Sequence, residues 1–333
     1  MEAIWKDYVD LIAVADAAFY DISYVKGGEE ISIYRGKAQP RPGEERVYIT
    51  INDVCADFLK NTLPNISASF TPAELPVTFV IRVYDDEDDF WEYSASVQFL
   101  MDWSYNPNHD PLTDGLAHPI NGRVDARQAI LYTALNEEAL FADVTLKNGD
   151  TFQVIIPVAI TADFNADYND DFAKSLRSAG SGTAVFDLSE IPNIDKVVIK
   201  GVEYKVANSC ARYVLYYLNA YGGWDAFLIE GSHKELDQLT RESFNRAGEQ
   251  INYRNEIKKT IELNTWWLSD AQSLKMHHLL NSTSVYLHDL QENEVIPVVL
   301  ENTTTEYKTY LNQGGRLVNY KINVAYSHKR QRK

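Results

Sequence analysis

The chain has 333 residues, of which 45% are hydrophobic and 24% are charged, a composition typical of a globular protein with a hydrophobic core. One core seldom serves more than about 250 to 300 residues, so we expect two or three domains. The net charge of −17 argues against a protein that wraps duplex nucleic acid, because phosphate binding depends on clustered Lys and Arg.

Residues 328–333 (HKRQRK) are the exception to this acidic balance. A short basic terminus of this kind is either a solvated tail or a segment that docks on an acidic partner surface or on nucleic acid. For the remainder of the chain we expect no contact with nucleic acid.

Signals for secretion, membrane insertion and disulfide formation are not found in the sequence. Residues 1–10 (MEAIWKDYVD) are acidic where a secretory signal has a basic head, and no apolar run approaches the length of about 18 residues that spans a membrane. Two cysteines, Cys55 and Cys210, are too few for a disulfide framework and are interpreted as small buried hydrophobic residues. We expect a protein without a membrane span that does not use the general secretion route.

Residues 1–115 are predicted to form the first β-domain. Apolar residues alternate with polar ones at residues 47–51, 77–83 and 91–103, the period of half-buried strands. Gly27 and Gly28 precede a further strand and accept the positive φ of a two-residue hairpin turn. Strands at this spacing predict an antiparallel sandwich of immunoglobulin or fibronectin type.

Residues 116–205 are predicted to form a second sandwich of the same kind. Asn148 and Gly149 separate two strand-like runs in residues 142–158, which is the strongest short hairpin signal in the chain. Further short strands are expected near residues 185–188, 197–199 and 202–206. The fold class is therefore mainly β, with tandem antiparallel β-sandwich modules.

The only metal-like spacing lies between these strands, at Asp163, Asn165, Asp167 and Asn169. Oxygen ligands at alternate positions are typical of a calcium loop. However, Tyr168 stands where the sharp turn needs glycine, and Lys174 stands where the bidentate glutamate belongs. The segment is either a polar loop or a weak calcium site formed by Asp163, Asn165 and Asp167, and we expect no cofactor.

Residues 206–333 are predicted to form a C-terminal β-domain around the run YVLYYL at residues 213–218. Both faces of this run are apolar, which indicates a central strand. Residues 219–223 then turn the chain into a returning strand that begins at Trp224. Tyr221 and Trp224 either pack across the domain or provide aromatic rings on which a carbohydrate could stack.

One packed helix is predicted at residues 270–281, where Ser269 and Gln272 fit a capping box. Ala271, Leu274, His278 and Leu279 are expected near one face of it. His277 and His278 diverge by about 100° on a helix, so they do not suit one metal ion, and an interface or surface role is expected. Four closing strands should follow, with a turn at residues 312–315.

Three segments of this domain, YYLNAYGGWDAFLIEG, LNTWWLSDAQSLKMHHLLNSTSVYLHDL and IPVVLENTTTEYKTYLNQGGRLVNYKINVAYS, resemble tail or virion structural proteins of phages and prophages of gut Bacteroidetes. The resemblance covers about 120 residues well and departs at Trp266 and Gly315. Its motifs are packing and turn residues, so it supplies no catalytic residues. It implies a virion component of the tail, collar or baseplate, made in the cytoplasm of the bacterial host.

Enzyme motifs are not found: the sequence has no nucleophile elbow, phosphate-binding loop, dinucleotide fingerprint or zinc-protease signature. We therefore expect a non-enzymatic structural subunit that forms a ring-like homo-oligomer and contacts other virion proteins. The alternative is a carbohydrate-binding β-protein for host-surface glycans, with Tyr221, Trp224, Trp266 and Trp267 as stacking residues. A hydrolase would need a pocket with converging carboxylates.

Overall fold

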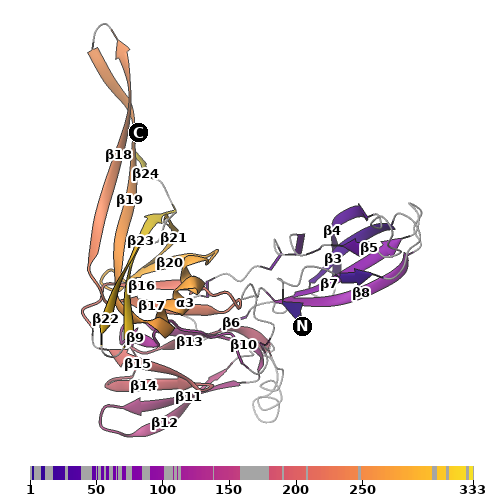
Figure 1. The fold of residues 1–333 in the computed structure, drawn as a ribbon, viewed down its shortest axis with the longest axis horizontal. Helices are drawn as coiled ribbons and strands as arrows, with labels where there is room; N and C mark the ends of the chain where they lie inside the picture. Colours follow the sequence, from indigo (N-terminus) through magenta and orange to yellow (C-terminus); the bar gives the residue numbers. More distant parts are fainter. Residues whose placement is uncertain are drawn as a thin grey trace, which may run out of the picture.

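The computed structural model describes the chain from residue 114 to residue 332 except 138, 158–179, 190, 208, 247–248, 302–305, 313–314 and 328–329. Before residue 114 it describes residues 2–3, 9–11, 18–26, 29–38, 47–49, 51, 54–55, 58–59, 63–64, 66, 70–72, 77–84, 91–100, 108 and 111. The described residues form a mainly β protein built from antiparallel sheets, which confirms the predicted class at this level (Figure 1). The metal-like spacing at Asp163, Asn165 and Asp167 lies outside the described residues.

The N-terminal sheet has the strand order β1-β8-β7-β3-β4 and stands to one side of the molecule in Figure 1. Its strands are β1 (Glu2–Ala3), β3 (Ala18–Lys26), β4 (Glu29–Ala38), β7 (Val77–Tyr84) and β8 (Trp91–Leu100). Buried and half-buried residues alternate along the whole of β7, as predicted. Lys26 pairs with Glu29, which confirms the hairpin expected at the two glycines. β2 (Val9–Leu11) and β5 (Val47–Ile49) form a separate pair.

A second unit consists of two sheets that share one core. The five-stranded sheet has the order β12-β11-β14-β15-β9, and the three-stranded sheet has the order β10-β13-β6. Buried residues from both sheets, including Ile130, Phe186, Val144 and Val197, form one cluster. The elements are β6 (Phe70–Pro72), β9 (Arg123–Asp125), β10 (Ala129–Glu137), β11 (Ala139–Leu146), β12 (Thr151–Pro157), β13 (Gly180–Asp187), β14 (Ile194–Ile199) and β15 (Val202–Ala207).

The predicted hairpin at Asn148 and Gly149 is confirmed, since β11 and β12 pair along their full length and Gly149 has a φ of +92°. The chain before residue 115 also contributes to this unit. Phe70–Pro72 pairs with Gly182–Ala184 of β13, so a strand from the predicted first domain completes the three-stranded sheet of the second.

The C-terminal sheet has nine strands and the path β17-β16-β20-β21-β23-β19-β18, with β22 paired to β23 and β24 to β19. Its strands are β16 (Tyr213–Leu218), β17 (Trp224–Ile229), β18 (His233–Arg246), β19 (Glu249–Ser269), β20 (Val285–Asp289), β21 (Glu294–Leu300), β22 (Glu306–Asn312), β23 (Gly315–Tyr326) and β24 (Arg330–Arg332). Every residue of β16 is buried, and β16 pairs with β17 on one side and β20 on the other, which confirms the predicted central strand.

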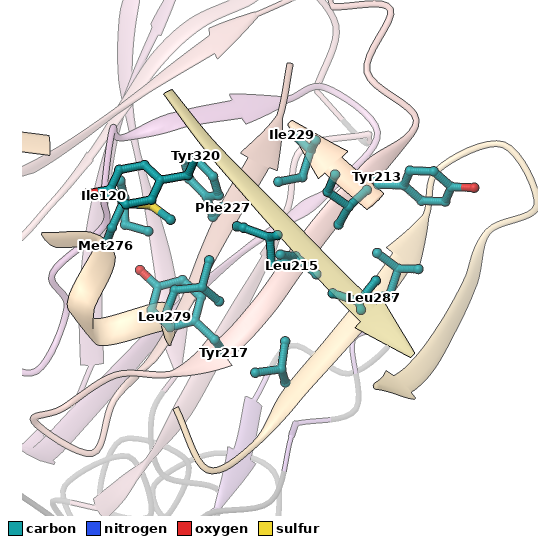
Figure 2. Close-up of a cluster of buried hydrophobic side chains, with 14 of the residues drawn as sticks. Ile120, Tyr213, Leu215, Tyr217, Phe227, Ile229, Met276, Leu279, Leu287 and Tyr320 are labelled. Atoms are coloured by element: carbon teal, nitrogen blue, oxygen red, sulfur yellow. The ribbon is translucent and has the colours of Figure 1, made fainter. Parts of the chain in front are cut away.

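The two faces of β16 belong to different clusters of buried residues. Tyr213, Leu215 and Tyr217 face the cluster drawn in Figure 2, which also contains Phe227, Leu279 and Tyr320. Val214, Tyr216 and Leu218 pack with Trp224 and with Ala129, Leu131 and Val185 of the second unit. The second and third predicted domains therefore share a core.

Helix α3 (Asp270–Leu280) has the predicted capping box: Gln272 N–H donates to Ser269 Oγ at 3.3 Å, and Ser269 N–H donates to Gln272 Oε1 at 2.9 Å. The predicted packing face was partly wrong. Met276 and Leu279 are the buried residues, whereas Leu274 is 71% exposed. Leu274 lies on the opposite side of the helix from Met276, because two helical residues that are two positions apart diverge by about 200°.

The structure differs from the sequence interpretation at one of the two cysteines. Cys55 is buried as expected, but Cys210, which lies three residues before β16, is exposed. Among the described residues, no helix is long and apolar enough to cross a membrane.

Candidate interaction surface

A long β-hairpin projects from the C-terminal sheet, and sequence analysis did not find it. Its strands are β18, with 14 residues, and β19, with 21 residues. They pair continuously from His233↔Leu263 to Arg246↔Glu249 with one irregularity at Glu242 and Ser243. Figure 1 shows the two strands extending well beyond the rest of the sheet. We call residues 233–264 the arm.

Support for the arm comes mainly from its base. β23 pairs with β19 only over residues 260–269, and β24 pairs with β19 at Asn255–Ile257. β18 is the last strand of the sheet path, so its outer edge pairs with no described strand. Isolated two-stranded ribbons are at best marginally stable in water. Contact with another surface would therefore stabilise the outer part of the arm.

The base of the arm is held by a network of charged and phenolic groups. Glu235 of β18 accepts hydrogen bonds from Arg212 Nη1 and from Tyr213 Oη, each at 2.8 Å. Arg212 Nη2 also lies 2.8 Å from Asp289 Oδ2. Burial acts to raise the pKa of Asp289, but the hydrogen bonds from Arg212 and from two backbone N–H groups outweigh it and hold that pKa below its usual range. The network joins Glu235, at the base of the arm, to Arg212, Tyr213 and Asp289.

The charge of the arm differs from that of the whole chain. Residues 233–264 contain six basic and six acidic residues in the sequence, so they carry none of the net charge of −17. The basic residues are Lys234, Arg241, Arg246, Arg254, Lys258 and Lys259, and the acidic residues are Glu235, Asp237, Glu242, Glu249, Glu256 and Glu262. The pairing of β24, which contains Arg330 and Arg332, adds basic residues to the same hairpin. Part of the basic terminus thus forms a strand on the arm.

The structure separates the four aromatic residues that sequence analysis grouped. Trp224 is fully buried, so its ring is not available to stack on a carbohydrate at the surface. The structure therefore confirms the alternative in which Trp224 packs inside the domain. Tyr221 is half-buried, and its ring centroid lies 4.3 Å from that of His118 and 5.3 Å from that of His278. Trp266 and Trp267 are 59% and 39% exposed. Only the last pair presents substantial aromatic surface to solvent.

Trp266 is exposed because β19 contains a bulge. Asn264 pairs with Lys321 and Trp267 with Asn319, so Thr265 and Trp266 together oppose Tyr320. Trp266 has a φ of +62°, and its N–H donates to Asn264 Oδ1 at 2.9 Å. Asn319 Nδ2 donates to the same oxygen at 2.8 Å. The bulge turns the side chain of Trp266 out of the sheet, and no signal in the sequence marks it.

A buried polar group lies where the turn at residues 219–223 meets the second unit. Asn219 Nδ2 donates to Leu116 O at 2.6 Å and to Asp225 Oδ2 at 2.7 Å, and His118 N–H donates to the same carboxylate oxygen at 3.1 Å. Burial raises the pKa of Asp225 to about 7, although these hydrogen bonds and nearby Lys275 act to lower it. Asp225 and Asn219 have almost no exposed surface, so this group holds two parts of the fold together.

The predicted divergence of the two helix histidines is consistent with their surroundings. His277 is exposed, whereas His278 is half-buried and accepts a hydrogen bond from Ala220 N–H at 3.3 Å. Within the described residues, no group of three or more His, Cys, Asp or Glu side chains is placed to hold a metal ion. Compared with known proteins, the sequence matches no family model and no curated protein.

Proposed function

We propose that this protein is a non-enzymatic structural subunit that assembles with further copies of itself through the arm. The observation that carries this proposal is the projecting hairpin of β18 and β19, whose outer edge pairs with no described strand. Projecting β-ribbons and open strand edges are surfaces on which other chains add strands. An arm that binds a different surface of its neighbour makes a heterologous contact, and such contacts build a ring where the rotation closes and a filament where it does not.

We base the proposed kind of assembly, a phage particle, on the sequence resemblance. Three segments of the C-terminal domain resemble virion proteins, so the proposed place of action is the tail, collar or baseplate region of a phage particle, after synthesis in the bacterial cytoplasm. Other virion proteins would be its further partners. Within this proposal the first two modules are immunoglobulin- or fibronectin-like sandwiches, and the C-terminal sheet contributes the arm.

The experiment that tests self-assembly is the mass of the purified full chain by light scattering over a range of concentrations, followed by electron microscopy of any large species. A discrete oligomer with rotational symmetry supports the proposal. A monomer at every concentration, with no subunit-to-subunit cross-linking, contradicts it. Mass spectrometry of purified phage particles that encode the chain tests its presence in the virion separately.

A second candidate function is carbohydrate binding, which the exposure of Trp266 and Trp267 favours. Aromatic rings at a protein surface stack on the apolar faces of sugars. A glycan array with the wild-type chain and with Trp266→Ala and Trp267→Ala variants tests this candidate. Binding that is lost in both variants supports it, whereas equal signals from all three chains contradict it.

A further inference from the structure

We propose that the edge strand β12, together with Phe141 on β11, is the docking site for the arm of a second copy of this chain. This inference rests on the proposed function, since it names the surface that receives the arm. The arm would add its open strand β18 beside β12 and extend the five-stranded sheet across the subunit boundary.

β12 is the end strand of its sheet and carries no charged residue, although Pro157 stands at its last position. It pairs with β11 from Thr151 to Pro157 and is the end strand of its sheet, so its other side pairs with no described strand. Edge strands of soluble proteins usually carry charged residues that discourage pairing with another chain. β4, another edge, contains four charged residues in EEISIYRGKA, whereas β12 reads TFQVIIP and contains none.

An exposed apolar surface accompanies this edge. Phe141 and Ile155 are directly opposite each other on β11 and β12, and they are 50% and 63% exposed. Phe152, at the start of β12, is also exposed, but it lies on the opposite face of the strand from Ile155 and does not belong to this pair. Covering this cross-strand pair would be favourable, because each Å² of apolar surface removed from water contributes about 25 cal/mol. The face is therefore suited to a neighbour that brings both backbone hydrogen bonds and apolar contacts.

The position of the arm points to a second copy as the occupant. Figure 1 shows the arm leaving the molecule in the direction away from β12, which lies at the opposite end with β11. An arm at one end and a receiving edge at the other give a head-to-tail contact, which closes into a ring or continues as a filament. The open strand β18 has 14 residues and β12 has 7, so one arm covers the whole edge.

Charge also favours the arm as the segment that approaches another copy. Two chains with a net charge of −17 repel each other, but residues 233–264 carry balanced charges and β12 carries none. Leu236 and Leu239 of β18 are exposed apolar residues near the base of the arm. The contact between arm and edge thus joins β18, which has three basic and three acidic residues, to a strand that has no charged residue.

The first test compares the full wild-type chain with Ile155→Lys by light scattering over a concentration series. Ile155 is exposed, so lysine is compatible with the fold but places a charge on the edge. Val299→Lys is the matched control, because Val299 is 55% exposed on β21 of a different sheet. We expect at least a tenfold weaker association for Ile155→Lys and no change for Val299→Lys. Unchanged association of Ile155→Lys overturns the inference while leaving self-assembly in place.

The second test uses a chain with a shortened arm. Replacing residues 238–258 by Asn-Gly joins Asp237 to Lys259, which are paired in the hairpin, through a two-residue turn. We expect this chain and Ile155→Lys to be monomeric separately. Mixed at equal concentrations, they should form a dimer, because one supplies an intact arm and the other an intact edge. A mixture that stays monomeric contradicts the arm-to-edge contact.

A photo-reactive phenylalanine analogue at position 141 separates failure of this inference from failure of the proposed function. Cross-links between subunits that map to residues 233–264 support the arm as the occupant. Cross-links to any other segment show self-assembly through a different surface and overturn the inference. If the wild-type chain is monomeric by scattering and gives no cross-links between subunits at the highest concentration, both proposals are overturned.

Discussion

Tyr217 and Asp225 stand directly opposite each other on β16 and β17, and both side chains are buried. Burial raises the pKa of Tyr217 well above its usual value, and the negative charge of Asp225 raises it further. The same two effects act on Tyr204 of the neighbouring unit. Within the described part of the chain, Asp225 Oδ1 and both phenol oxygens have no hydrogen-bond partner. This environment favours a protonated, neutral carboxyl group at Asp225.

The raised pKa of Asp225 predicts a loss of stability as the pH rises. The unfolded carboxyl has a pKa of about 3.9, and the folded one has a pKa of about 7, so the folded chain holds an extra proton between these values. The contribution of this group is therefore complete below about pH 4 and declines up to about pH 7, by a total of about 4 kcal/mol.

Asp225→Asn tests this prediction, because the amide is neutral at every pH and its oxygen still accepts from Asn219 and His118. The free energy of unfolding should be higher for the variant than for wild type at pH 8, and the difference should shrink towards pH 4. Urea titrations at several pH values measure it, and the comparison at equal pH removes the effect of other carboxylates. A difference that does not change with pH would contradict the assignment.

Replacing Trp224 should destabilise the fold strongly, in contrast to Trp266. Trp224 is fully buried between the second unit and the C-terminal sheet, so Trp224→Ala leaves a cavity and should cost about 3 to 5 kcal/mol of unfolding free energy. Trp266→Ala should change stability by less than about 1 kcal/mol, since the ring is mostly exposed. Thermal and urea unfolding of both variants gives the comparison, and equal losses would contradict the assigned burial.

Trp266→Gly should stabilise the chain slightly. Trp266 has a φ of +62°, a region that costs about 1 kcal/mol for residues with a Cβ atom and that glycine adopts freely. We expect a gain of a few tenths to about 1 kcal/mol over Trp266→Ala, the matched control that keeps the Cβ atom. If glycine is less stable than alanine, the bulge does not hold this conformation in solution.

The capping box of α3 makes a separate contribution. Ser269→Ala removes the hydroxyl that accepts from Gln272 N–H and should lower the unfolding free energy by about 1 kcal/mol. Ser269→Asp is the control, because an aspartate at the same position accepts the hydrogen bond and retains most of the stability. Circular dichroism with urea titration measures both variants, and equal losses would exclude capping as the cause.

The network at the base of the arm predicts unequal effects of its two ion pairs. Arg212→Ala leaves the largely buried carboxylate of Asp289 without its cation and should cost about 1 to 3 kcal/mol at pH 7. Glu235→Gln keeps an acceptor for Tyr213 and loses only a partly exposed pair, so it should cost less than about 1 kcal/mol.

Acid titration adds a second measure of the same network. The pKa of Asp289 is lowered in the folded chain, so its contribution is present above the unfolded pKa of about 3.9 and is lost as the pH falls. The penalty of Arg212→Ala should therefore shrink in acid. A penalty that is constant from pH 7 to pH 3 would show that packing of the arginine, and not its charge, is responsible.

Local sequence patterns determined much of the secondary structure. The alternation along residues 77–84, the Asn148–Gly149 turn and the capping box of Ser269 and Gln272 each act between residues close in the chain, and each is found where it was predicted. The apolar run at residues 213–218 likewise determined a central strand, because a strand with two apolar faces must be covered on both.

Only the tertiary structure decided the features on which the proposed function depends. The side chains described on β18 are exposed, so no core-facing apolar pattern marks that strand of the arm. The pairing of Phe70–Pro72 with β13 joins residues more than a hundred positions apart. Trp224 and Trp266 are the same residue type, yet one is buried and the other exposed. Burial and edge position are set by contacts between distant segments, and a short window of sequence does not contain the partner.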